Sequence, residues 1–310
     1  MEPNQTEVAV VVPVFNARDH VALLIDSLKR LTSQNLAVEV CLVDNGSKDG
    51  SIDVLSTSGF DVSSFDDWSS SYAARNVAIQ KTKAPIIAFT DSDCVVHRDW
   101  IINGVNYMIE TGCEVVAGKV EFSFIDRNSG WEIRDALVNM DNEQSVRRGY
   151  AKTANLFVKR EVFDSIGSFD SHATSGEDAE WTKRASIRGF KLGYCDNAIV
   201  YHPTRTAMES LVKSVRVGIG YTRRRASSTR AGLPYEMALL VTILRGFLPP
   251  NPFAYLRQLR RKGWRFPVAR LMVPGWFCSI ASSYGILLSC YKAIFKRRLT
   301  ASVIKAVNDD

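Results

Sequence analysis

The sequence predicts an α/β protein built on a doubly wound, mostly parallel sheet. Short apolar runs alternate with stretches of helical apolar spacing, and the connections between them are short. The first apolar runs suit buried strands and lie at 8–14, 38–43 and 86–90. Polar residues follow these runs at Asn16, Asp44 and Asp91. Because the carboxyl ends of parallel strands share one sheet edge, we expect these side chains to converge on one site.

The other elements follow in chain order. Asn16 can cap a first helix, in which Val21, Leu24 and Leu28 share one face. Composition predicts helices at 51–55, 72–81, 100–109 and 179–188, and strands at 114–124, 154–158 and 199–201. Residues 127–148 are polar and show no clear period.

The length and the cysteine content of the chain limit the kinds of protein that it can be. The chain has 310 residues, of which 46% are hydrophobic, enough for one large or two modest domains. Its six cysteines form no C-x-x-C pair, which favours a reduced, cytosolic protein over a disulfide scaffold or zinc site. The first seven residues are polar and lack an apolar core, so we expect no secretory signal.

The charge is divided unevenly along the chain. Residues 205–310 hold 19 Lys/Arg and four Asp/Glu, which gives a net charge of +15. Residues 1–204 hold 20 Lys/Arg and 29 Asp/Glu, which gives a net charge of −9. This asymmetry suggests two regions with different tasks. We predict a catalytic domain at 1–220 and a basic, mainly helical region at 221–310.

Two aspartates one residue apart, Asp91 and Asp93, follow the third apolar run. Carboxylates this close repel each other unless a cation or a donor compensates them. Their oxygens suit Mg²⁺ or Mn²⁺, which commonly bind together with a diphosphate. Asp-Ser-Asp is also good turn chemistry, so the motif alone leaves a polar turn open. The dinucleotide motif G-x-G-x-x-G after the first strand and the phosphate-binding G-x-x-x-x-G-K-[ST] are both absent from the sequence.

Eight short motifs occur in the order typical of one enzyme family. They are V-V-P-V-F-N at 11–16, V-D-N-G-S-K-D-G-S at 43–51, A-R-N at 74–76, F-T-D-S-D at 89–93, A-N-L-F at 154–157, I-G-S-F-D at 166–170, G-E-D at 176–178 and V-Y-H at 200–202. Together they resemble the family 2 glycosyltransferases, which have the nucleotide-sugar-binding fold called GT-A. The resemblance covers residues 8–203.

The resemblance implies a nucleotide-diphospho sugar as donor and a role for each matched residue. Pro13, Phe15 and Asn16 would border the nucleotide base. Asp44 would hydrogen-bond that base, and Arg75 would approach the diphosphate region. The basic segment adds Arg223 and Arg225, which are candidates for a diphosphate contact or for a solvated basic face.

The resemblance also implies the metal and catalytic residues. Asp91 and Asp93 would form the D-x-D pair, Asp91 nearer the ribose and Asp93 on Mn²⁺ or Mg²⁺, and His202 would be a further metal ligand. Asp178 would be the catalytic base, and Glu177 would lie near the acceptor or diphosphate.

Simpler readings of these residues remain open from sequence alone. Glu177 and Asp178 could be first-turn acids of a helix. His202 could be a core histidine bonded to a carbonyl, and Arg75 could be a solvated helix residue.

Two departures from the family pattern matter. Cys94 stands after the aspartate pair, where relatives commonly have an acidic or polar residue. The Q-x-x-R-W motif of processive polysaccharide synthases is missing from the sequence near Tyr221. The second departure favours the addition of one sugar.

The basic region is predicted to meet a membrane. Residues 271–291 are free of charge and long enough to span a bilayer, yet both flanks are basic, which fits a single crossing poorly. We favour helices in the interface or a re-entrant hairpin attracted to anionic lipid, with a true span and a soluble core as alternatives. Charge beside long apolar runs points to lipid rather than nucleic acid.

The sequence therefore predicts an inverting, metal-dependent glycosyltransferase at the cytoplasmic face of a membrane. Its acceptor would be a glycan or lipid-linked glycan in polysaccharide or envelope assembly. One alternative is a sugar nucleotidyltransferase, although the glycine-rich loop of that class is absent after the first strand. The other is an inactive sugar-binding or scaffolding protein.

Overall fold

The computed structural model describes residues 7–32, 37–65, 70–226 and 234–308, and gives side chains for 7–31, 37–65, 70–222 and 234–293. The chain divides into two compact units. The sheet unit comprises Met1–Ile125, Val138–Ala173 and Glu177–Thr204. The helical unit comprises Asp126–Leu137, Thr174–Gly176 and Arg205–Asp310.

The sheet unit alternates strands and helices along most of its length. Its strands are β1 (Val8–Val14), β2 (Val38–Asp44), β3 (Asp61–Ser64), β4 (Ile86–Thr90), β5 (Val95–Val96), β6 (Val115–Ser123), β7 (Asn155–Lys159) and β8 (Leu192–Pro203). Its helices are α1 (Arg18–Thr32), α2 (Ser51–Ser56), α3 (Ser71–Lys81), α4 (Trp100–Thr111), α6 (Asn142–Arg147), α7 (Arg160–Ile166) and α8 (Glu177–Ile187).

The eight strands form one mixed, mostly parallel sheet in the order β3-β2-β1-β4-β7-β6-β8-β5. The parallel pairs are β1 with β2 and β4, β2 with β3, and β6 with β8. Strand β7 runs antiparallel to both β4 and β6, and β5 runs antiparallel to β8. The predicted fold class is therefore confirmed, and β1, β2 and β4 end at the same edge.

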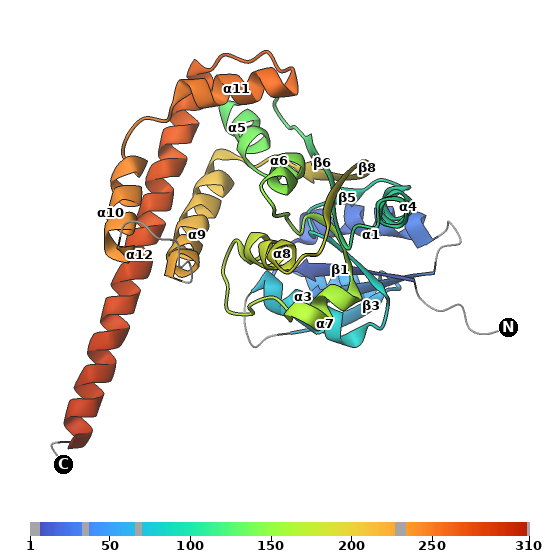
Figure 1. The fold of residues 1–310 in the computed structure, drawn as a ribbon, viewed down its shortest axis with the longest axis horizontal. Coiled ribbons are helices and arrows are strands. Elements are labelled where there is room, and N and C mark those ends of the chain that lie inside the picture. The colour runs from blue at the N-terminus through green and yellow to red at the C-terminus, as the bar shows by residue number, and fades with distance from the viewer. Residues whose placement is uncertain (1–6, 33–36, 66–69, 227–233, 309–310) are drawn as a thin grey trace. The chain divides into compact units, whose positions relative to one another are not determined.

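Helices cover both faces of the sheet (Figure 1). Alternate residues of β1 point to opposite faces, as the strand period of two requires. Val10 and Val12 pack on the side of α1 and α4, whereas Val11 packs on the side of α3, α7 and α8. All seven residues of β1 are buried, which explains its nearly continuous apolar sequence.

A buried asparagine fixes the second half of the sheet. The Asn155 side chain donates to the backbone oxygens of Lys119 and Ala198, at 2.7 and 2.8 Å, and accepts from Trp100 Nε1 at 2.8 Å. It thereby spans the β-bulge between Gly118 and Lys119, where the register of β6 against β8 shifts. Asn155 of the A-N-L-F motif therefore has a structural role. Its hydrogen bond to Ala198 holds β8, the strand that also carries His202.

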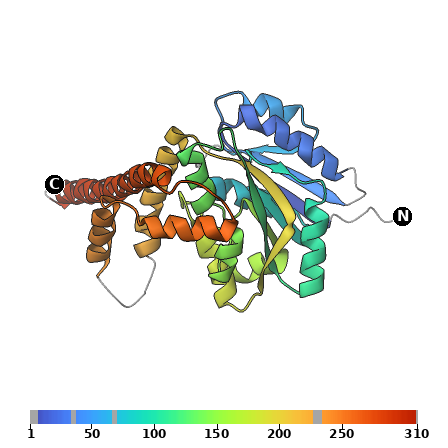
Figure 2. The same ribbon diagram turned by 90° about the horizontal axis from the view of Figure 1, so that it is seen from above.

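The helical unit consists mainly of helices after residue 205. They are α9 (Ala207–Ala226), α10 (Tyr235–Gly246), α11 (Pro252–Lys262) and α12 (Ala269–Asn308), and α5 (Gly130–Val138) belongs largely to the same unit. Figures 1 and 2 show α9 and α10 alongside α12. The last segment of the helical unit begins at Arg205, because α9 packs along α12, and the division into a catalytic domain at 1–220 and a basic region at 221–310 stays a prediction.

The structure also adds elements that the sequence analysis missed or shortened. The polar stretch 127–148 contains α5 and α6, and β3 was not expected. Strand β8 begins at Leu192, well before the predicted 199. The uncharged run 271–291 lies within one continuous helix, α12, in spite of Pro274 inside it.

Candidate active site

Asn16 joins the loop after β1 to the loop after β2. Its backbone N–H donates to Ser47 Oγ at 2.9 Å, and its Oδ1 accepts from the Lys48 N–H at 2.9 Å. Its φ of 47° is left-handed, a conformation that asparagine tolerates better than most residues. Pro13 is buried in β1, whereas the neighbouring Phe15 ring is 52% exposed and available to a ligand.

Asp49 makes a second connection between the same loops. Its Oδ2 accepts from the Arg18 N–H at 3.0 Å, and its Oδ1 accepts from the Ser51 hydroxyl at 2.5 Å. These bonds, first the one from Ser51 and then the one from Arg18, lower the pKa of Asp49 from its ordinary value of 3.8 to about 2. The K-D-G-S part of the motif therefore holds the loops together.

Asp44 ends β2 with an oxygen that has no partner. The side chain is 4% exposed, and its Oδ2 accepts from the Ser47 N–H at 3.1 Å. Among the described residues, Asp44 Oδ1 and the neighbouring Asn45 Oδ1 are buried acceptors without a hydrogen bond. Buried acceptors of this kind are costly unless a donor reaches them. The N–H groups of a nucleotide base fit that need, as the role expected of Asp44 requires.

Arg75 in α3 forms a salt bridge with Asp91 at the end of β4. Its Nη2 lies 2.5 Å from Asp91 Oδ1. The Arg75 side chain is 3% exposed and that of Asp91 27% exposed. The alternative of a solvated helix residue is therefore wrong for Arg75. The salt bridge leaves part of the Asp91 carboxylate open to solvent.

Tyr72, one helical turn before Arg75, connects this salt bridge to Asp178. The Tyr72 hydroxyl donates to Asp178 Oδ1 at 3.2 Å, and the Arg75 guanidinium carbon lies 5.6 Å from the centre of the Tyr72 ring. Burial, and then the charge of Asp178, raise the pKa of Tyr72 well above its ordinary value. The hydroxyl therefore stays protonated and positions the half-buried Asp178 carboxylate at the start of α8.

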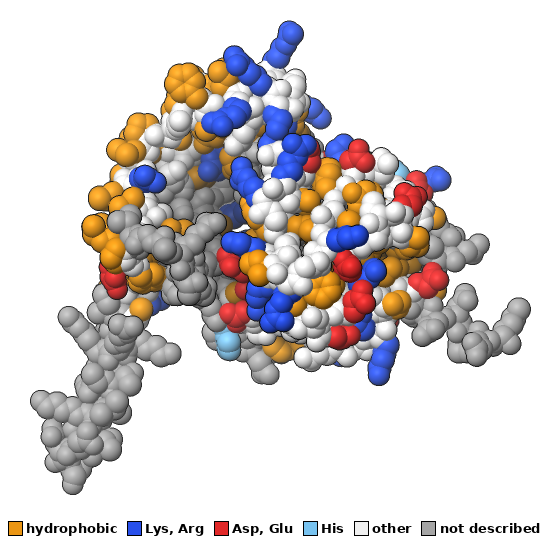
Figure 3. All heavy atoms as spheres, in the orientation of Figure 1, with side chains coloured by type: hydrophobic (Ala, Val, Ile, Leu, Met, Phe, Trp, Pro, Cys, Tyr) orange, Lys and Arg blue, Asp and Glu red, His pale blue; other side chains and the backbone are white. Residues whose placement is uncertain are grey.

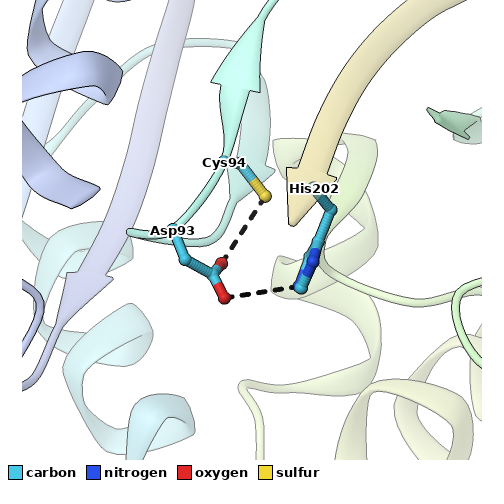
Figure 4. Close-up of side chains that lie close together, drawn as sticks. All are labelled: Asp93, Cys94 and His202. Atoms are coloured by element: carbon cyan, nitrogen blue, oxygen red, sulfur yellow. Dashed lines mark hydrogen bonds and ion pairs between the residues drawn. The ribbon is translucent and has the colours of Figure 1, made fainter. Parts of the chain in front are cut away.

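His202 of β8 faces Asp93, which follows β4 (Figure 4). His202 Nε2 lies 3.4 Å from Asp93 Oδ2, and His202 Nδ1 lies 2.6 Å from the Pro203 carbonyl oxygen. The Cys94 Sγ lies 3.8 Å from Asp93 Oδ1. One ligand atom from each of Asp93, Cys94 and His202 falls within a cluster no wider than 4.8 Å.

These residues fit a divalent cation. The short contact to the Pro203 carbonyl requires a proton on Nδ1, so in neutral His202 the Nε2 lone pair faces the Asp93 carboxylate. Two acceptors at this distance need a cation or a proton between them. Cys94 is less suited to bind a cation than Asp93 and His202, because the thiolate is the form that binds metal. Burial and then the charge of Asp93 raise the pKa of the Cys94 thiol well above its ordinary value. Asp91 contacts Arg75 instead and is outside this cluster.

Glu177 is held by neighbours within the sheet unit. Its Oε1 accepts from the Asp170 N–H at 3.0 Å and lies 3.3 Å from Arg184 Nη2. Burial raises the pKa of Glu177. These contacts give it a structural task, and its contact with acceptor or diphosphate stays a prediction. Arg223 and Arg225 lie in α9, but their side chains are outside the described set.

Sequence reasoning missed three of the residues that build this site. Tyr72 carries no sequence signal beyond its place in a helix, and its contact with Asp178 spans 106 residues. Asn45 stands beside a predicted site residue, but its unpartnered oxygen becomes visible only in the fold. Cys94 was noted as a departure from the family pattern, without a place in the cluster.

Comparison with known proteins decides the family. Residues 9–171 match the family described as Glycosyl transferase family 2. The chain is 36% identical over 289 residues to Glycosyltransferase AglE of Haloferax volcanii, which covers 90% of this chain and 95% of that protein. The chain belongs to glycosyl transferase family 2. This glycosyltransferase is also 24% identical over 211 residues to the O-antigen chain rhamnosyltransferase RfbN of Salmonella typhimurium, covering 63% of this chain and 66% of RfbN.

Solved structures share the fold of this glycosyltransferase. The mannosyltransferase PcManGT from Pyrobaculum calidifontis, in complex with GDP-Man and Mn²⁺, aligns with a TM-score of 0.59 at 16% identity, over 94% of this chain and 88% of PcManGT. S. aureus TarS 1-349 in complex with UDP-GlcNAc aligns with a TM-score of 0.52 at 15% identity, over 93% and 92% of the two chains. The expected GT-A fold of this glycosyltransferase is confirmed.

Proposed function

We propose that this glycosyltransferase moves one sugar from a nucleotide-diphospho sugar to a hydroxyl of a glycan or lipid-linked acceptor, with inversion at the anomeric carbon. The process it serves would be the assembly of polysaccharide or envelope glycan. Family membership supports sugar transfer and speaks against the alternative of a sugar nucleotidyltransferase. The absent Q-x-x-R-W motif favours a single addition.

One observation carries the proposal: a continuous series of contacts joins the acidic residues at the sheet edge. Asp178 contacts Tyr72, the Tyr72 ring lies beside Arg75, and Arg75 contacts Asp91. Asp93 follows two residues later and faces His202. The residues expected to bind the donor, hold the metal and act as base thus lie around one region of the sheet unit.

The chemistry assigned to Asp178 is general base catalysis. Its carboxylate takes the proton of the acceptor hydroxyl while that oxygen bonds to the anomeric carbon and the bond from this carbon to the diphosphate breaks. A single displacement of this kind inverts the anomeric centre. Because Tyr72 holds one carboxylate oxygen by hydrogen bonding, the other oxygen is left to meet the acceptor.

The cofactor is assigned to Asp93 and His202, with Asp91 nearby in its salt bridge. A divalent ion, Mn²⁺ or Mg²⁺, supplies positive charge to the departing diphosphate when it is bound. An imidazole ligand suits Mn²⁺ better than Mg²⁺, which prefers oxygen ligands. PcManGT, a protein of the same fold, was solved with Mn²⁺.

The proposed place of action is the cytoplasmic face of a membrane with anionic lipid. The support is the net charge of +15 on residues 205–310 together with an apolar helix, Ala269–Ala293, that is long enough to cross a membrane by length and composition. A lipid-linked acceptor would be concentrated on such a surface. Nucleic acid is not among the proposed partners.

The proposal is tested by a screen of nucleotide sugars for slow donor hydrolysis. The full chain is incubated with each donor and Mn²⁺, with Mg²⁺, or with EDTA, and the released nucleoside diphosphate is measured. We expect one donor to be cleaved in Mn²⁺ and to be spared in EDTA. Equal cleavage in EDTA would contradict the metal assignment. Release of a nucleoside monophosphate and a sugar 1-phosphate, instead of a nucleoside diphosphate and the sugar, would contradict sugar transfer.

A further inference from the structure

Helices α10 and α12 present one continuous set of exposed apolar side chains. We call this set the apolar face, and it consists of Met237, Leu240, Leu244, Val273, Phe277, Tyr284, Leu287 and Tyr291. Each of these side chains is between 46% and 65% exposed. Their spacing of three, four or seven residues places them on one side of each helix. Figure 3 shows apolar side chains gathered where Figure 1 draws α10 and the first half of α12.

Charged residues bound the apolar face and are absent within it. The segments 237–244 and 271–291 contain no charged residue. Glu236 and Arg245 bound the first segment, and Arg270 and Lys292 bound the second. An exposed apolar area bordered by charge marks a surface that meets another apolar phase.

The helices of this unit approach one another through glycines. A Cβ atom added at Gly218 of α9 would lie 2.0 Å from the Ser282 oxygen, and one added at Gly285 of α12 would lie 2.1 Å from the Val215 oxygen. A Cβ atom added at Gly246 of α10 would lie 1.9 Å from Ser283 Oγ. Helices α9 and α10 therefore approach α12 closely, as small residues permit in membrane helices.

Hydroxyl groups fill the same contacts. Thr222 Oγ1 lies 2.8 Å from Ser289 Oγ, and the Ser283 hydroxyl donates to the Ile243 carbonyl oxygen at 3.2 Å. Thr222 and Ser283 are buried. Small and polar residues thus lie at these helix contacts together with buried apolar residues such as Leu239, Leu271 and Ile286, while a second set of large apolar residues is exposed. The buried apolar area stabilises the bundle, but it does not account for the exposed set.

We propose that the apolar face lies among the acyl chains of one leaflet of a bilayer, with α10 and α12 parallel to its surface. This inference rests on the membrane association proposed above and names the surface that makes it. The 21 residues of 271–291 extend about 30 Å, so their length alone would permit a crossing. However, one side of α12 packs on α9, which carries Glu209, Lys213 and Arg216, and only the other side is apolar and exposed.

Lipid fits the apolar face better than a second copy of the chain. Arg245, Arg270 and Lys292 stand at its edges, and α11 adds Arg260, Arg261 and Lys262 in its last turn. Two such faces brought together would place these positive charges opposite one another. An anionic leaflet would instead attract them to its headgroups while the apolar side chains enter the acyl region.

The depth of two positions along α12 tests the orientation. Phe277→Cys and Leu287→Cys, each in a Cys290→Ser background, are labelled with a nitroxide in vesicles of phosphatidylcholine and phosphatidylglycerol. Collision with oxygen and with a water-soluble nickel complex then reports the depth of each label. We expect both labels to prefer oxygen and to lie at the same depth. A label at Ile109→Cys, an exposed position of α4, should prefer nickel.

Other outcomes overturn the proposal in different ways. Depths that differ by about 15 Å, the axial distance between the two positions, would show a helix that crosses the bilayer. Labels on bound protein that prefer nickel would show surface attachment without insertion. Labels shielded from both reagents in a dimer would show a second copy at this face. Because none of these readings requires sugar transfer, they are independent of the proposed enzymatic activity.

Vesicle flotation with charged variants gives a second test. Leu240→Glu/Leu244→Glu changes two exposed side chains of α10, and Leu23→Glu/Ile109→Glu changes two exposed side chains of the sheet unit. We expect the α10 variant to partition at least about tenfold more weakly, because a carboxylate is costly in the acyl region. The control should float like the wild type, and wild-type binding should persist at about 1 M salt, where surface attraction is screened. Equal flotation of both variants, or release of the wild type by salt, would contradict the proposal.

Discussion

His202 Nε2 lies 3.4 Å from Asp93 Oδ2 in the sheet unit. The other ring nitrogen of His202 is committed to a backbone carbonyl, so the ring cannot turn without losing that hydrogen bond. Strand β8 supplies the histidine, and the turn after β4 supplies the aspartate. His202 does bond a carbonyl, as a core histidine would, yet its second nitrogen faces a carboxylate that is 32% exposed. The proposed role of His202 as a metal ligand would account for that second contact.

Replacement of Asp178 by asparagine should stop transfer and leave donor binding nearly unchanged. The amide keeps the size of the side chain and the hydrogen bond from Tyr72, but it cannot accept the acceptor proton. We expect kcat to fall by about 10²–10⁴-fold. Turnover and donor affinity are measured for Asp178→Asn, with Glu180→Gln in the same helix turn as the control. Normal turnover of Asp178→Asn would remove this residue from its proposed role.

The salt bridge between Arg75 and Asp91 should contribute to stability. Arg75→Met leaves the Asp91 carboxylate without its nearest cation, and because Asp91 is partly exposed we expect a loss of about 2 kcal/mol in unfolding free energy. That loss corresponds to a fall of roughly 4–8 °C in Tm. Arg98→Met, which removes an exposed arginine 3.5 Å from Asp99, should cost at most about 0.5 kcal/mol. Similar losses for the two variants in denaturant unfolding would contradict this account.

Asp49 should stabilise the loops around Asn16 in a pH-dependent way. Its folded pKa of about 2 lies below the ordinary 3.8, so its contribution is complete above the ordinary value and is lost as the pH falls toward 2. Asp49→Asn should therefore lower Tm at neutral pH, and the difference from wild type should shrink on acidification through that range. Thermal unfolding followed from neutral to acidic pH measures this, with the exposed Asp53→Asn as control. A constant difference would argue against the hydrogen bonds to Asp49 as its source.

Much of the fold was predictable because the strands have a strong local signal. The apolar runs that became β1, β2 and β4 are short, buried on both faces and followed by polar residues. Strand β3 has the sequence D-V-S-S, with only one buried residue, so it lacks that signal. Helix α6 has a single apolar residue, and helix α5 has only nine residues, so neither shows an apolar period over several turns.

The site was predictable only where residues follow strands or match family motifs. Asp44, Asp91 and Asp93 became candidates in this way, and the sheet register brings the ends of β1, β2 and β4 together. The contact of Tyr72 with Asp178 depends on how α3 packs near α8, a relationship that no local pattern contains. The same holds for Cys94, since its direction is fixed by the turn after β4 and by burial in the core.

Direct Mn²⁺ binding tests the central claim most plainly. Free Mn²⁺ is measured by electron paramagnetic resonance while the full chain is titrated with the ion in the presence of the nucleoside diphosphate that the donor screen identifies. We expect Asp93→Asn and His202→Ala each to weaken binding by at least about 10–100-fold, the loss that follows removal of even an outer-shell partner of a ligand. Asp99→Asn and His97→Ala are the matched controls, because Asp99 and His97 form a half-exposed contact of 3.8 Å elsewhere in the sheet unit. Both controls should bind Mn²⁺ as the wild type does. Wild-type affinity in Asp93→Asn and His202→Ala would contradict the proposed metal site.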